Sequence, residues 1–329
     1  MTVSLLRALA HSSRHPPASI LRRGLALLGI TLLVPSAPAQ SQQRHPVWNL
    51  AIDNDDFALW RSVQSRSDRD YSSGIELALL HPLQSPPTSR WARTGVFSIS
   101  HRLYTPDIRS ADSTLADRPF AAFLGVRAAL QLERPGMWHE FGVGASVTGP
   151  PAFGRELQTF FHELTGSPAP EGWDRQVPFR MGLSASYAGA RRLIGMRSTS
   201  MFGFDVAGLW GAELGSFRSA VTVGTRTTLG LRPPRPWARP GQPDETPGTR
   251  VYLIGGLALD AVVYDATLRW DDFPDAPKLD NHVLVPRAEA GIGLEFGGVS
   301  VSWLGVVTGR EFTSQPSPHA YGSFRIAIR

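Results

Sequence analysis

The sequence predicts an all-β fold, an antiparallel transmembrane β-barrel of about twelve strands with a short helix in one loop. Two observations lead to this prediction. Segments of about ten residues in which apolar side chains alternate with small, polar or charged ones recur along the chain, as in strands between lipid and a wet lumen. In addition, nothing after the N-terminal region approaches the roughly 18 consecutive apolar residues of a membrane-spanning helix.

The N-terminal region has the features of a secretory signal peptide. Four arginines and no acidic residue accompany an apolar run at 24–34 that is too short to span a membrane, followed by Ala-Pro-Ala at 37–39. We therefore expect a signal peptide at 1–39 and one mature domain at 40–329. Its removal lowers the formal net charge of +5 by four, so the basic composition gives no support for nucleic-acid binding. The chain has no cysteine, so disulfides cannot stabilise the exported protein.

Alternation is clearest in "AVTVGTRTTLGL" at 220–231. Val221 and Val223 fall on one face of the expected strand, while Thr222 and Arg226 fall on the other. Twelve runs of this kind occur, at 47–53, 72–80, 94–103, 120–132, 137–148, 178–189, 198–210, 217–231, 250–263, 283–296, 298–309 and 318–328. A soluble secreted β-sandwich would also alternate. Trp and Tyr at many strand ends favour the membrane barrel, where aromatic residues mark the two interfaces.

Strand order predicts which loops meet. If the mature chain starts in the periplasm, the loops after odd-numbered strands face outside, and three polar segments fall there: "DNDD", "YTPDIRSADSTLADRPF" and "GPPAFGRELQTFFHELTGSPAPEGWDRQ". Convergence of distant segments at one rim is what a functional site requires. The same count puts the Pro/Arg-rich segment 232–248 on the periplasmic side, where turns are usually short, and this conflicts with the strand assignment.

One helix is expected in the third polar segment, at 155–166. Leu157, Phe160, Phe161 and Leu164 form an apolar stripe, and Gly166 is a suitable C-cap. Gln158 and His162 are one helical turn apart on another face, so an amide and an imidazole can address the same small volume. Taken alone, such a histidine is more often only a polar residue on a loop helix.

The ordered motifs "DNDD", "DRDYSSG", "YTP", "DRPFAAFL", "QTFFH", "GWDRQ" and "REFTSQ" resemble, in order and spacing, the outer-membrane lipid A 3'-O-deacylase family (LpxR). The resemblance covers nearly the whole mature chain. It implies a twelve-stranded barrel with a calcium-dependent site near its extracellular end. The expected reaction is hydrolysis of the 3'-linked acyloxyacyl ester of lipid A in the outer leaflet, by a monomer embedded in the bacterial outer membrane.

The resemblance also implies roles for individual residues. Asp55 is the expected calcium ligand, and Asn54 and Ser72 are expected to hold water or the ester carbonyl. Gln158 and His162 match the helical pair of the family. A family lysine has no lysine counterpart here, because Lys278 is the only lysine in the chain; Arg109 is the nearest cation and the candidate substrate-binding residue.

The residue types permit this chemistry. Ca²⁺ prefers oxygen ligands, and a neutral histidine such as His162 can take a proton from water and return it to a leaving alkoxide. A serine nucleophile, Ser72 or Ser73 with His162, is the alternative mechanism. Arginines of the three polar segments, such as Arg118, either contact lipid A phosphates or form ion pairs that brace the loops. The alternative functions are a general outer-membrane phospholipase or esterase and a non-enzymatic pore.

Overall fold

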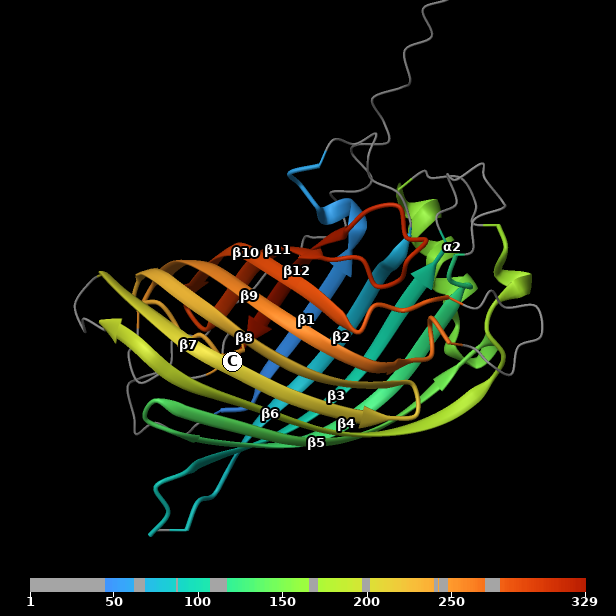
Figure 1. Ribbon diagram of the computed structural model, residues 1–329. Coiled ribbons are helices and arrows are strands. Elements are labelled where there is room, and N and C mark those ends of the chain that lie inside the picture. Colours follow the sequence, from blue (N-terminus) through green and yellow to red (C-terminus); the bar gives the residue numbers. More distant parts are fainter. Residues whose placement is uncertain are drawn as a thin grey trace, which may run out of the picture.

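Twelve antiparallel strands close into one barrel in which β1 pairs with both β2 and β12 (Figure 1). The computed structural model describes residues 45–61, 69–86, 88–106, 117–165, 171–196, 202–239, 242, 248–269 and 279–329. The strands are β1 (Val47–Asn54), β2 (Asp70–Leu83), β3 (Ala92–Thr105), β4 (Ala121–Arg134), β5 (Met137–Thr148), β6 (Arg180–Met196), β7 (Phe202–Gly215), β8 (Arg218–Leu231), β9 (Arg250–Asp265), β10 (Leu284–Phe296), β11 (Val299–Thr308) and β12 (His319–Ile328). The fold class and all twelve predicted strands are confirmed, whereas the predicted signal peptide lies outside the described residues.

The predicted strand ends are correct to within about three residues except in β6 and β7, and β7 ends at Gly215, five residues beyond its predicted end at 210. The larger difference is in β6. This strand continues to Met196, seven residues beyond its predicted end at 189. The predicted end leaves Arg191 and Arg192 outside the strand. In the structure Arg192 belongs to β6, and its Nε lies 2.7 Å from Asp205 Oδ1 on β7.

The two faces of the wall differ in polarity as the sequence predicts. Phe97, Val143 and Leu257 point outward and are 57%, 64% and 66% exposed, which suits contact with lipid rather than water. Inside the barrel, Arg127 Nη2 donates to Glu140 Oε1 at 2.7 Å, and the guanidinium of Arg226 pairs with Glu289. Among the described helices, none is both long and apolar enough to cross a membrane. An apolar outer face around a charged interior favours the membrane barrel over the soluble sandwich.

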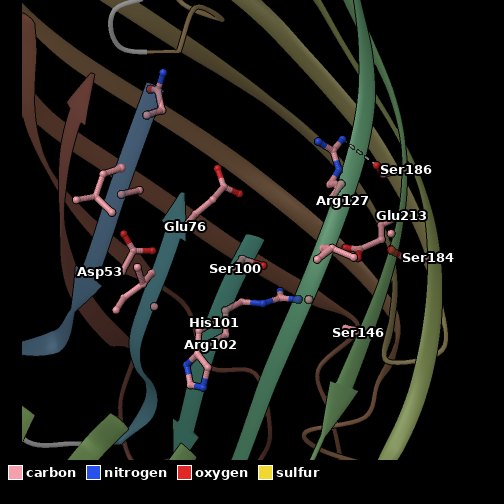
Figure 2. Close-up of a pocket in the computed structure, with 18 of the residues that line it drawn as sticks. Asp53, Glu76, Ser100, His101, Arg102, Arg127, Ser146, Ser184, Ser186 and Glu213 are labelled. Atoms are coloured by element: carbon pink, nitrogen blue, oxygen red, sulfur yellow. Dashed lines mark hydrogen bonds between the residues drawn. The ribbon is translucent and has the colours of Figure 1, made fainter. Parts of the chain in front are cut away.

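A polar chamber of about 580 Å³ lies inside the barrel (Figure 2). Its walls carry Asp53, Glu76, Arg102, Arg127 and Glu213, from five different strands. Acidic and basic side chains are mixed, so the charges compensate one another within the lumen instead of forming a region of one sign.

The first part of the long loop after β8, residues 232–239, folds back into the barrel. Trp237 is 7% exposed and packs against Ala190 and Ala207 on the inner wall, and its Nε1 donates to Glu133 Oε1 at 2.7 Å. Arg239 Nη1 donates to Glu76 Oε1 at 2.7 Å. Because it follows an even-numbered strand, this loop leaves the barrel at the end opposite α2, as strand order predicts. The strand assignment was correct, and the expectation of a short turn failed because the loop fills part of the lumen.

The two faces should respond oppositely to a new charge. Replacing the outward Val126 by Arg should lower the free energy of unfolding by about 2–4 kcal/mol, because the guanidinium would sit in lipid. The control is Ser184→Arg, at nearly the same depth but facing the chamber beside Glu213. Urea unfolding in lipid vesicles measures both; equal destabilisation would contradict the assignment of faces.

Candidate functional site

The predicted site residues meet at one end of the barrel, where β1, β3 and β5 end and β2, β4 and β6 begin. We call this the α2 end, because helix α2 (Gly154–Thr165) lies there next to β4 (Figure 1). The 3-10 helix η1 (Asp55–Phe57) follows β1 at the same end, and η3 (Pro150–Ala152) and η4 (Trp173–Arg175) flank α2 in the chain. The described parts of the three polar segments thus lie at one end of the barrel, as strand order predicts, and the assignment of this end to the outside of the cell stays a prediction.

Asn54 and Asp55 lie where β1 turns into η1. The side chain of Asn54 caps η1, because its Oδ1 accepts a hydrogen bond from Asp56 N at 2.8 Å. Asp55 is buried, with 1% of its surface exposed, whereas Asp56 is exposed. Asp53 points into the chamber (Figure 2). Its Oδ2 accepts a hydrogen bond from the Tyr71 hydroxyl at 2.9 Å. Of the three acids in this segment, Asp55 alone is both buried and placed at the start of η1.

Ser72 owes its position to a β-bulge in β2. Tyr71 pairs with Tyr104 and Ser73 pairs with Leu103, so Ser72 is an extra residue between two regular pairs. Tyr71 faces the lumen, while the Ser72 hydroxyl lies 2.5 Å from the hydroxyl of Thr105. Ser72 is buried, with 3% exposed.

Helix α2 docks on the outer wall through one apolar side and one hydrogen bond. Leu157 packs against a buried cluster that includes Leu103, Ala122 and Trp173. Gln158 is buried, and its Oε1 accepts from Trp173 Nε1 at 2.6 Å. His162, one turn further on, is half-buried. The predicted helix is confirmed to within one residue at each end, and Gln158 is a packed residue rather than a freely solvated one.

The predicted apolar stripe of α2 is only partly buried. Leu157 packs on the wall, but Phe160 is 58% exposed. The side chain of Leu164 and the expected cap Gly166 lie outside the described part of the chain. One part of the apolar stripe therefore packs on the wall, and the other part is exposed beside the helix.

An apolar groove of about 480 Å³ lies between one side of α2 and the outer wall of the barrel. On the wall side it is lined mainly by the outward residues Ile75, Ile99 and Leu124, and on the helix side by Leu157 and Phe160. The groove lies on the lipid-facing side of the barrel, so it opens beside the membrane and not into the lumen.

Behind this wall, Arg118 forms ion pairs with two acidic side chains. Its side chain is fully buried, with Nη2 2.7 Å from Glu311 Oε2 and Nε 3.2 Å from Asp70 Oδ1. Burial alone would lower the pKa of Arg118, but Glu311 and Asp70 outweigh it and hold that pKa above its ordinary value. Burial raises the pKa of Glu311, although Arg118 opposes this. Arg118 is therefore a brace between loops, one of the two roles expected for these arginines.

Two expectations fall outside the described residues: Arg109, the candidate substrate-binding cation, and Lys278. Within the described ranges, His, Asp and Glu do not gather in groups of three or more that could hold a metal ion.

Comparison with known proteins agrees with this architecture. The model of the family described as "Outer membrane protein LpxR" matches residues 25–329. The chain belongs to the LpxR family. As a member of it, the protein is located in the bacterial outer membrane, as its barrel with an apolar outer face also indicates.

The solved structure of LpxR from Salmonella typhimurium is similar to the chain, with a TM-score of 0.72 at 20% sequence identity, covering 86% of this chain and 99% of that one. A more distant barrel is the β domain of the Bordetella autotransporter Brka, with a TM-score of 0.43 and 11% identity over 86% of this chain and 98% of that one. No curated protein matches the sequence. At these identities the structural likeness to the Salmonella LpxR barrel concerns the fold.

Sequence reasoning missed three parts of the candidate site. Thr105 contacts Ser72, Trp173 holds Gln158, and the groove floor is built from Ile75, Ile99 and Leu124. Thr105 and Trp173 stand within motifs shared with the LpxR family, "YTP" and "GWDRQ", so a signal was present for both. The floor residues look like any other outward strand residues, and only the docked helix distinguishes them.

The docking of α2 can be tested at Gly154. A Cβ there would lie 2.5 Å from the Trp173 ring and 2.6 Å from Ala122 Cβ. Gly154→Ala should therefore cost about 1–3 kcal/mol of docking free energy, equivalent to about 5- to 150-fold faster amide hydrogen exchange in α2. Gly255→Ala is the control, since its Cβ would meet nothing within 4 Å. Unchanged exchange in α2 of the Gly154 variant would contradict the packing described.

Proposed function

We propose that this protein is a lipid A deacylase that hydrolyses the 3'-linked acyloxyacyl ester of lipid A in the outer leaflet. The observation that carries the proposal is the apolar groove on the outer wall, because it lies at the α2 end of the barrel, where the described residues expected to do chemistry also lie. Gln158 and His162 belong to α2, the helix that forms one side of the groove. Ser72 lies near the start of β2, the strand that carries Ile75 on the other side.

The groove suits acyl chains. Its lining is mainly aliphatic and aromatic, with Ser100, His101 and Glu156 as the polar members. Burying each methylene of a chain there contributes about 0.8 kcal/mol. A substrate anchored in the outer leaflet can enter from the side of the barrel without leaving the membrane. This access requires the α2 end to face the outside of the cell, the orientation expected from strand order.

The donor set fits calcium in its chemistry. Asp55 supplies a buried carboxylate, Ser72 a hydroxyl, and Asn54 a side-chain amide, all hard oxygen donors, and the chain has no cysteine to favour a softer metal. Asp55 would hold the ion, together with oxygens of neighbouring groups. When bound, Ca²⁺ would supply positive charge that polarises the ester carbonyl.

The proposed reaction is general-base hydrolysis. His162 takes a proton from water as the water oxygen bonds to the ester carbonyl carbon. The bond between the carbonyl carbon and the sugar oxygen then breaks, and His162 returns that proton to the leaving alkoxide. The sugar departs with a 3'-hydroxyl, and the acyl group leaves as a carboxylic acid. Trp173 donates to Oε1 of Gln158 and so fixes the orientation of the amide. The NH₂ group of that amide would donate to the oxyanion or orient His162.

The contacts of Ser72 favour water over serine as the nucleophile. Its hydroxyl is bonded to Thr105, and His162 is not among the partners that the described structure gives it. A serine nucleophile needs its base within hydrogen-bond reach. We therefore assign Ser72 to holding water or the ester carbonyl, beside Asn54.

The phosphates of lipid A carry negative charge, and exposed arginines at the α2 end are suited to bind them. Arg155 on α2 and Arg175 in η4 are exposed there. Arg109 is the proposed counterpart of the family lysine in the loop after β3. Guanidinium groups pair with phosphate oxygens in a two-point geometry, so an arginine can replace a lysine in this role.

Expression of the protein in cells with unmodified lipid A tests the function. Mass spectrometry should show loss of the 3'-linked acyloxyacyl group from lipid A. Unchanged lipid A with released phospholipid fatty acids would instead identify a general phospholipase, and no change in either lipid would favour a non-enzymatic barrel.

Removal of the base and of the metal should each abolish the reaction. His162→Ala should lower kcat by about 10²–10⁴-fold, the usual worth of a general base. His81→Ala, at an exposed position near the other end of β2, is the control and should keep full activity. Chelation should abolish activity, and Ca²⁺ but not Mg²⁺ should restore it. Full activity of the His162 variant or of chelated protein would refute the mechanism.

Replacing Ser72 by Ala separates the two nucleophiles. With water as nucleophile, kcat should fall by a factor of about 10–100, since one positioning contact is lost, and no acyl-enzyme should form. A covalent acyl adduct on the native protein, found by intact-mass spectrometry and absent from the variant, would establish serine attack instead.

A further inference from the structure

The backbone just before the bulge of β2 is in an unusual conformation. Asp70 has a φ of +57°, in the left-handed region that few residues other than glycine adopt. Such a residue persists when contacts around it hold it there, and Asp tolerates the region better than most. Asp70 is 3% exposed and lies two residues before Ser72.

Both oxygens of the Asp70 carboxylate are held from the lumen side. Arg118 Nε lies 3.2 Å from Oδ1, and Gln315 Nε2 donates to Oδ2 at 2.9 Å. Gln315 is fixed in turn, because its Oε1 accepts from Glu311 N at 2.6 Å. Arg118 also pairs with the Glu311 carboxylate and lies between the rings of Tyr104 and Phe312, each 5.4 Å from its guanidinium carbon.

The next residue is held as well. His319, which is 2% exposed, lies with Nε2 2.9 Å from the carbonyl oxygen of Tyr71. A carbonyl only accepts, so Nε2 of His319 is the donor. The two residues that precede Ser72 are thus contacted from three places: the loop after β3, the loop after β11 and the first residue of β12.

The bulge decides which way Ser72 faces. In a regular strand successive side chains alternate, so Ser72 would pair with Tyr104 and point into the lumen. With the bulge, Tyr71 takes that inward place and the Ser72 hydroxyl meets Thr105 instead. A shift of one residue here would remove the hydroxyl from the side of the wall that carries the groove.

We propose that Asp70 and Arg118, supported by Glu311, Gln315 and His319, are positioning residues that act through the bulge to aim Ser72 at the reacting ester. The proposal rests on the proposed function, because it assigns the network a role in that reaction. It also explains why three motifs that contain none of the expected site residues, "DRPFAAFL", "REFTSQ" and the first half of "DRDYSSG", come together: they build the inner support of the site.

A disulfide trap tests the geometry independently of activity. The chain has no cysteine, and the hydroxyls of Ser72 and Thr105 lie 2.5 Å apart. The double variant Ser72→Cys with Thr105→Cys should therefore form a disulfide rapidly with diamide, scored by counting free thiols with a maleimide polymer. Failure of this parent to cross-link would overturn the proposal, because the outward placement of Ser72 would be wrong.

The network is then altered in that parent. Asp70→Ala and Arg118→Lys should each slow cross-linking by about tenfold or more, since a lost buried partner lets the strained backbone relax. Asp70→Asn should slow cross-linking less than Asp70→Ala, because Asn tolerates the left-handed conformation, although it loses the ion pair with Arg118 and one of its two oxygens. The control is Glu289→Gln, which weakens the Arg226 pair on the inner wall away from the bulge. Only the folded fraction is counted, from the shift in gel mobility on boiling. Equal rates in the Asp70→Ala, Arg118→Lys and control proteins would refute the proposal.

Kinetics of the same changes in the cysteine-free protein link the geometry to catalysis. Arg118→Lys should lower kcat on lipid A by about 10–100-fold while KM changes less than about twofold, because the groove that binds acyl chains is untouched. A rise in KM with unchanged kcat would refute the positioning role. If the native protein has no deacylase activity, the proposed function fails and the catalytic role fails with it. The disulfide rates then still decide whether the network sets the bulge.

Discussion

The hydrogen bonding between β1 and β12 is the constraint on which the rest of this structure depends. Seven residues of β1 pair with seven of β12, from Trp48 with Ile328 to Asn54 with Gly322. Because this pairing leaves no free edge, every strand is locked in register with its neighbours and every side chain is committed to one face of the wall. In a soluble sheet a local shift in register costs packing on one side. Here it would put a charge into lipid or an apolar group into water.

Because each side chain is committed to one face, the inner and outer faces of the wall can have different roles. The lumen is filled with paired charges such as Arg127 with Glu140, and by the loop that carries Trp237 and Arg239. Pairing matters there because a charge away from bulk water is costly unless it is compensated. The candidate site uses the opposite face, where α2 covers an apolar part of the wall near the membrane. The lumen is thus a rigid support, and the chemistry is proposed to happen outside it.

Much of the fold could be predicted from the sequence, because alternate residues of each strand in a membrane barrel face lipid and lumen and therefore alternate in polarity. The observed bounds of β5 coincide with the predicted ones, and β8 differs by a single residue. Strand order alone was sufficient to bring Asn54, Asp55, Ser72 and α2 to one end. The loop after β8 was unexpected because its proline and arginine content suits a solvated turn, and nothing local indicates that Trp237 turns back into the lumen.

The direction in which site residues face could not be predicted in the same way. Ser72 sits at a bulge, and the residues that hold this bulge are Arg118 and Gln315, which are far from it in sequence. Local pattern carries no information about such distant contacts. The same holds for Gln158, whose partner Trp173 follows 15 residues later in a short 3-10 helix, and for the groove floor, which exists only once α2 has docked.

The sideways opening of the groove has a consequence for how substrate is supplied. A site that opened into the lumen would sample molecules dissolved on either side of the membrane. The groove beside Leu124 and Phe160 samples the lipids that diffuse past the barrel in the plane of the leaflet. For the proposed reaction, the relevant concentration is therefore a mole fraction in the surface. Diluting lipid A with other lipids would slow turnover, whereas diluting the whole membrane suspension in buffer would not.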